Sequence, residues 1–141
     1  MIYCDTSLLV TALSVEAHST EVQRWLAEQD AGTLCISDWV VTEFSSAVAL
    51  KLRRGEFTAD DGTTALANWR TVQRERLVLL PVPQPAFAFA ARYCEMPVTG
   101  LRAADALHLA VAALGGHALA TLDARLAEGA QAVGVRVVGV G

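Results

Sequence analysis

Short apolar runs alternate along the chain with longer stretches whose apolar residues have helical spacing. The short runs predict five strands, at residues 2–4, 33–36, 77–82, 117–121 and 135–138. The longer stretches predict helices, from about residue 8 and at residues 18–29, 38–54, 58–75, 83–94, 102–114 and 124–132. Strands that alternate with helices imply a mostly parallel sheet between helical layers. The predicted fold class is therefore α/β, with a central sheet of about five strands.

Local signals sharpen several of these boundaries. Ser37 is the expected N-cap of the helix at 38–54, and Gly55 lies where a helix-ending glycine is expected. Thr58 and Asp61 have the spacing of a capping box at the start of the next helix. The unbroken apolar run at 77–82 predicts a strand covered on both faces.

Bulk properties favour one globular domain over residues 1–141. Hydrophobic residues make up 53% of the chain and charged residues 18%, which argues against disorder. No apolar run approaches the roughly 20 residues of a membrane-spanning helix, and the first residues lack the basic start of a signal peptide. We therefore expect a cytoplasmic protein without a membrane partner. The separated cysteines Cys4, Cys35 and Cys94 predict buried reduced thiols, not a disulfide framework or a zinc site.

Four acidic residues are the candidate functional residues. Asp5 and Asp123 each follow a predicted strand, and Glu43 lies on the second turn of a helix that begins at a strand end. Asp105 lies in the first turn of an otherwise apolar helix, where a carboxylate is rarely buried without a partner. Because ligands of such sheets bind outside the carboxyl ends of the strands, topology predicts that all four lie at one edge.

Four clustered carboxylates repel one another, and a hard divalent cation relieves that repulsion. Oxygen ligands without His or Cys suit Mg²⁺, with Mn²⁺ as an alternative. Such an ion can activate water against a phosphodiester. The formal net charge of −4 does not exclude RNA, because the other 11 acids match the 11 Lys and Arg residues.

Four segments carry a family resemblance. They are Asp5-Thr6-Ser7, Ser37 through Glu43-Phe44, Leu101 through Ala110, and Ala120-Thr121-Leu122-Asp123. In this order and spacing they resemble the four acidic motifs of PIN domains, and the length is similar to that of VapC-type toxins.

The resemblance implies a single PIN domain and a Mg²⁺- or Mn²⁺-dependent endoribonuclease that cuts structured RNA, often tRNA or rRNA. It also implies a homodimer and a cognate antitoxin that inhibits it. By position, the metal ligands and catalytic residues are Asp5, Glu43, Asp105 and Asp123. The hydroxyls expected to support those carboxylates or a bound water are those of Thr6, Ser7 and Thr121.

Several residues admit a functional and a structural interpretation. Arg102 could contact RNA phosphate or pair with an acid at the rim of the site. His108 lies one turn after Asp105 on the same face, and we favour a packed, hydrogen-bonded residue over a ligand. Six basic residues lie within residues 51–76, where a solvated pair of helix faces competes with an RNA-tracking surface. The three tryptophans are expected as core or dimer anchors: Trp25, Trp39 and Trp69.

Other function classes depend on residues that are missing. A haloacid-dehalogenase-like phosphatase would use Asp5 as a nucleophile, but Ser7 stands where that family has a second Asp. A phospho-receiver module needs an Asp after the third strand, where this chain has Pro81. Both classes also need a late Lys, whereas Lys51 is the single lysine. A non-catalytic PIN fold that only binds partners stays open.

Overall fold

The computed structural model describes residues 1–14 and 18–140. Five parallel strands form one sheet in the order β3-β2-β1-β4-β5, which confirms the predicted fold class. The strands are β1 (Ile2–Cys4), β2 (Leu34–Ser37), β3 (Val78–Leu80), β4 (Ala118–Ala120) and β5 (Val137–Val138). Since all five run in the same direction, the segments that follow them emerge at one edge.

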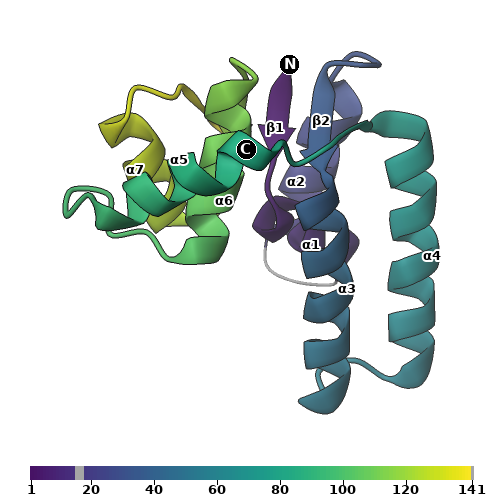
Figure 1. Cartoon of the computed structure of the whole chain (residues 1–141). Coiled ribbons are helices and arrows are strands. Elements are labelled where there is room, and N and C mark those ends of the chain that lie inside the picture. The colour runs from purple at the N-terminus through teal and green to yellow at the C-terminus, as the bar shows by residue number, and fades with distance from the viewer. Residues whose placement is uncertain (15–17, 141) are drawn as a thin grey trace.

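Seven helices connect and cover the described strands. They are α1 (Thr6–Leu13), α2 (Ser19–Glu28), α3 (Asp38–Arg53), α4 (Ala59–Arg76), α5 (Gln84–Glu95), α6 (Ala103–Leu114) and α7 (Ala124–Ala132). In Figure 1, α5, α6 and α7 gather to the left of β1, and α1, α3 and α4 lie to its right. The contacts follow this grouping, because α5 and α7 pack on α6 while α2, α3 and α4 pack on α1. No helix among the described residues is long and apolar enough to cross a bilayer.

The core lies around the central strand β1 and its neighbours. Tyr3 and Cys4 of β1 and Leu119 of β4 are fully buried, and Tyr3 pairs in register with both Cys35 and Leu119. From α1, Leu8 packs onto this centre without any exposed surface. The short strands are thus held in place by side chains that leave water completely on folding. This burial stabilises the fold by about 25 cal/mol for each Å² of apolar surface.

The prediction for the third strand was wrong in its burial. β3 pairs only with β2 and forms an edge of the sheet, so it is not covered on both faces. Val78 is exposed, and Leu79 is 47% exposed. An apolar run does not distinguish a central strand from an edge strand, because the difference depends on which strand pairs beside it.

Most predicted helix signals are present, with one exception. Thr58 and Asp61 form the capping box at the start of α4, and Gly55 follows α3 with a φ of 71°. That left-handed conformation favours glycine. Ser37 does occupy the N-cap position of α3, but its side chain makes no capping bond. Its hydroxyl is used elsewhere, as described below.

The cysteines and tryptophans divide by position. Cys4 and Cys35 are buried free thiols as expected, whereas Cys94 is exposed on α5, against the prediction. Burial raises the pKa of the Cys35 thiol to about 11, so this group stays a protonated, unreactive thiol. Trp69 of α4 is a core residue, and its ring stacks on Phe44 of α3 with a centroid separation of 4.4 Å.

The Phe44–Trp69 stack is a buried apolar link between α3 and α4, and its removal should destabilise the fold. We expect Phe44→Ala to lower the free energy of unfolding by about 3–5 kcal/mol, because it removes a buried aromatic ring and leaves a cavity. Val98→Ala, at a position that is 67% exposed, should change it by less than about 0.5 kcal/mol. Urea denaturation measures both, and equal losses would contradict the assignment of the core.

Candidate active site

The structure brings the four predicted acids together at one hollow of about 270 Å³, beyond the carboxyl ends of β1 and β4. The carboxylates come from four different segments of the chain. They are Asp5 at the start of α1, Glu43 on α3, Asp105 on α6 and Asp123 at the start of α7. Thr6, Ser7 and His108 also line the hollow.

Asp5 is the most deeply buried of these acids, at 3% exposure. It is the N-cap of α1 and accepts a bond from the Leu8 backbone N–H. The Ser7 hydroxyl donates to the carboxylate at 2.8 Å, and the Thr121 hydroxyl donates to Oδ2 at 2.7 Å. Burial raises the pKa of Asp5, whereas the hydrogen bonds from Thr121, Ser7 and Leu8 oppose that rise.

Thr121 links Asp5 to the fourth acid. Its Oγ1 donates to Asp5 and accepts the backbone N–H of Asp123 at 3.0 Å. Asp123 caps α7, because its Oδ1 accepts the backbone N–H groups of Arg125 and Leu126. The capping and ligand interpretations of Asp123 are therefore compatible, since Oδ2 carries no hydrogen bond within the described residues.

Glu43 is held by two donors on a single oxygen. The Thr6 hydroxyl and His108 Nε2 both lie 2.5 Å from Oε2. Burial alone would raise the pKa of Glu43, but the hydrogen bonds from His108 and Thr6 lower it overall. Glu43 is thus kept ionised at the wall of the hollow.

Asp105 has the fewest interactions with the rest of the protein among the four acids. The structure gives it no hydrogen bond or ion pair within the described residues. Burial raises its pKa most and the negative charges of Asp123 and Glu43 raise it further, whereas the charge of Arg102 opposes the rise. Arg102 lies exposed at the N-cap of α6, where its charge acts on Asp105 without a direct ion pair.

The donor set fits a hard divalent cation. The hollow offers carboxylate and hydroxyl oxygens and no thiol, and Asp105 has no ion pair with a Lys or Arg within the described residues. Within residues 1–14 and 18–140, no group of three or more His, Cys, Asp or Glu side chains is already arranged to hold an ion. The fit to a cation therefore rests on the chemistry of the donor atoms.

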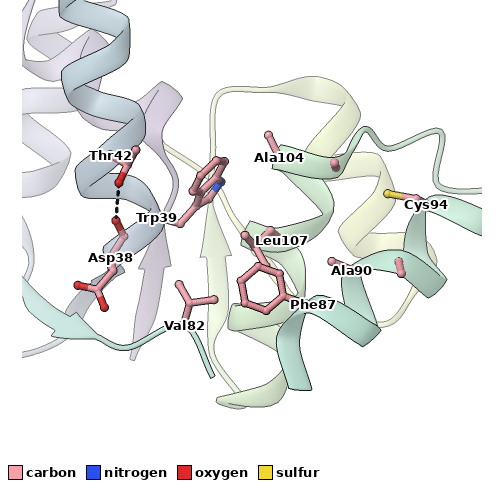
Figure 2. Close-up of a pocket in the computed structure, with 11 residues that line it drawn as sticks. Asp38, Trp39, Thr42, Val82, Phe87, Ala90, Cys94, Ala104 and Leu107 are labelled. Carbon is pink, nitrogen blue, oxygen red and sulfur yellow. Dashed lines mark hydrogen bonds between the residues drawn. The ribbon is translucent and has the colours of Figure 1, made fainter. Parts of the chain in front are cut away.

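A larger hollow of about 520 Å³ is lined by residues of α3, α5 and α6. Figure 2 shows the rings of Trp39 from α3 and Phe87 from α5 turned towards it, with Leu107 of α6. The rest of its lining includes small alanines of α5 and α6, and Phe87 is 57% exposed. The indole N–H of Trp39 is buried and has no hydrogen-bond partner among the described residues. This apolar hollow is suited to packing and not to hydrolysis.

The basic residues of α3 and α4 are partly used inside the protein. Arg76 donates to the backbone carbonyls of Leu26, Ala27 and Gln29, where α2 ends. Lys51 pairs with Glu56 at 3.3 Å. Arg53 and Arg70 are exposed, so part of this stretch forms a solvated surface.

Sequence reasoning missed Tyr3 as a site residue and missed the partner of His108. Tyr3 was treated only as part of a strand, yet its hydroxyl lies 2.9 Å from His108 Nδ1. His108 contacts Glu43 and not Asp105, its neighbour along α6. The available signal was the presence of two polar side chains in segments that are otherwise apolar.

Comparison with known proteins gives a consistent picture. The PIN domain family model matches residues 2–131. Ribonuclease VapC35 of Mycobacterium tuberculosis is 30% identical over an alignment that covers 100% of this chain and 98% of the relative.

Two solved structures share the fold. VapC20 of Mycobacterium tuberculosis, described as a sarcin-ricin loop cleaving toxin, superposes with a TM-score of 0.74 at 18% identity, over 98% of each chain. A toxin-antitoxin complex from Klebsiella pneumoniae gives a TM-score of 0.68 at 14% identity, over 98% of this chain and 97% of that one. At these identities, both comparisons show that the fold is shared.

The pKa of Asp105 predicts a dependence of stability on pH. A carboxyl whose pKa is raised on folding adds no penalty below its ordinary pKa of about 3.9, and its full penalty appears above the raised value. In EDTA, Asp105→Asn should therefore be more stable than wild type at pH 8, and this gain should vanish near pH 3.5. Denaturation curves at both pH values measure the effect, with the exposed loop change Asp30→Asn as the control. A variant less stable than wild type at pH 8 would contradict the repulsion at this site.

Proposed function

This chain belongs to the PIN domain family, among the VapC ribonucleases, and we propose that it is an endoribonuclease toxin that hydrolyses structured RNA with a divalent cation. The observation that carries the proposal is the meeting of four carboxylates from four separate segments at one hollow. Among the RNA classes, tRNA and rRNA are the proposed substrates, and the description of VapC20 as a sarcin-ricin loop cleaving toxin supports the second.

The proposed cofactor is Mg²⁺, with Mn²⁺ as an alternative. The residues that would hold it are Asp5, Glu43, Asp105 and Asp123. When bound, such an ion supplies an activated water and stabilises the charge that develops on the phosphodiester. The hydroxyls of Ser7 and Thr121 orient Asp5, and the hydroxyl of Thr6 orients Glu43. Arg102 at the rim is the proposed contact for an RNA phosphate.

We also propose a cognate antitoxin as the regulatory partner. Its support is the fold shared with a toxin that was solved as a toxin-antitoxin complex. A cytoplasmic location stays a prediction from the sequence. Membership of the family removes the phosphatase and receiver alternatives, whereas a catalytically silent member is still an outcome that the following experiment can reveal.

Purified protein should cleave structured RNA with Mg²⁺ or Mn²⁺, and EDTA should stop the reaction. Asp5→Asn and Asp105→Asn should each lower the cleavage rate on the order of 10²-fold or more, because even residues that only orient metal ligands contribute 10- to 100-fold. Sequencing of RNA ends after brief expression in cells identifies the target, and gel assays give the rates.

The matched control is Asp30→Asn, which removes one carboxylate from an exposed loop outside the hollow. It should cleave at the wild-type rate. Full activity in Asp105→Asn would refute the site, and the absence of cleavage of any RNA by wild type would favour a non-catalytic PIN fold.

We further propose that a second copy of the chain packs on the apolar hollow of Figure 2. In a two-fold dimer, the same surface of each copy must complement itself. Here the exposed ring of Phe87 lines a hollow whose walls include small alanines, so each copy presents an apolar surface that the same surface of a second copy could cover. The hollow shares α3 and α6 with the acidic site, which would place the partner next to that site.

The dimer proposal predicts that Phe87→Glu yields a monomer, because the charge would be buried in an apolar contact. Light scattering after size-exclusion chromatography measures the mass. Val98→Glu, another exposed apolar position that does not line the hollow, should leave the dimer intact. A dimer in the Phe87 variant would exclude this surface.

A further inference from the structure

A chain of buried polar groups runs from the sheet to the acidic hollow. The Ser37 hydroxyl lies 2.7 Å from the Tyr3 hydroxyl, which lies 2.9 Å from His108 Nδ1. On the other side of the imidazole ring, Nε2 lies 2.5 Å from Glu43 Oε2. The four residues come from β2, β1, α6 and α3, so the chain joins elements far apart in the sequence.

Three of its members are almost completely removed from water. Ser37 and Tyr3 have no exposed surface, and His108 is 2% exposed. Buried polar groups are costly unless every donor and acceptor is paired. The catalytic proposal above gives none of these three residues a task, although apolar side chains would fill the same positions without that requirement.

The hydrogen bonds have one direction that satisfies every group. Glu43 is ionised and can only accept, so Nε2–H of His108 must donate to it. Burial raises the pKa of Tyr3, which therefore keeps its proton and can donate to Nδ1 while it accepts from Ser37. In the opposite direction, the Ser37 hydroxyl would have no acceptor among the described residues. The chain thus directs the Nε2–H of His108 towards Glu43 and leaves Nδ1 to accept the bond from Tyr3.

The consequence for Glu43 is a fixed orientation. Donors from His108 and Thr6 both occupy Oε2, so the carboxylate cannot rotate without breaking two bonds. The other oxygen, Oε1, has no hydrogen bond within the described residues and is the one left for a ligand in the hollow. A glutamate on a helix otherwise has several rotatable bonds, and freezing them in advance lowers the cost of binding.

We propose that Tyr3 and His108 are positioning residues that hold Glu43 with a single oxygen free to face the cation. This inference rests on the proposed metal-dependent function. Neither residue touches the cation or the substrate. Each acts through Glu43, with Ser37 as the anchor of the chain in the sheet.

Binding of Mn²⁺ alone, measured by isothermal titration calorimetry, is the first test. His108→Leu fills the space without a donor and should weaken Mn²⁺ affinity about 10-fold, the lower end of the range for residues that orient metal ligands. His108→Gln retains an N–H donor and should recover most of that loss. Tyr3→Phe removes one hydroxyl and should give an intermediate loss. His117→Gln, a histidine that does not line the hollow, should bind as wild type does.

Stability separates positioning from mere packing. We expect His108→Leu to bind Mn²⁺ more weakly than His108→Gln under conditions where urea denaturation in EDTA shows that both variants are fully folded. If both His108 variants bind Mn²⁺ as tightly as wild type, the proposal is overturned. It is equally overturned if the affinity of the folded variants follows only their loss of stability.

The second readout needs no metal. Nitrogen NMR of the His108 ring in the metal-free protein should show a protonated Nε2 and a bare Nδ1, and Tyr3→Phe should give a mixture of tautomers. A ring with its proton on Nδ1 would overturn the proposal. If wild type shows the expected tautomer but binds no Mn²⁺, the metal-dependent function fails, whereas the hydrogen-bonded chain is still established.

Discussion

The hydrogen bonds around the buried carboxylate of Asp5 hold together the parts of the structure on which the site depends. Asp5 lies where β1 ends and α1 begins, and Thr121 reaches it from the end of β4. Its backbone N–H also donates to the Ala120 carbonyl at 3.2 Å. A carboxylate removed from water needs such donors. The same bonds that satisfy Asp5 therefore fix the relative positions of two strand ends and of the acids that follow them.

The two helices α3 and α6 serve two surfaces at once. Glu43 and Asp105 point into the acidic hollow, while Trp39 and Leu107 on the same helices line the apolar one. Because helices are rigid and both faces are packed, a partner on the apolar side and a cation on the acidic side would share one framework. The apolar surface and the acidic hollow are therefore neighbours because they share these two helices.

The helices and strands, and the clustering of the four acids, could be predicted from the sequence. The carboxyl ends of parallel strands lie at one edge of the sheet whatever the exact lengths of the strands. The exposure of β3 could not be predicted from the sequence, because an apolar residue such as Leu79 occurs in edge strands as well as in central ones. The link from Tyr3 through His108 to Glu43 did not follow either. It joins residues 105 and 65 positions apart, and no local pattern records such a contact. Ser37 shows the limit most directly, because the residue preferred at a helix N-cap uses its hydroxyl on Tyr3 instead.

The four carboxylates differ in how far the protein already satisfies them. Asp5 accepts bonds on both oxygens, Glu43 and Asp123 on one each, and Asp105 on neither within the described chain. The protein thus holds Asp5 firmly at the base of the hollow and leaves unsatisfied oxygens towards its rim. Charge that the fold does not compensate is charge that a cation can compensate. On this argument, Asp105 gains most from a bound ion, whereas Asp5 mainly supplies the fixed point against which the ion would be placed.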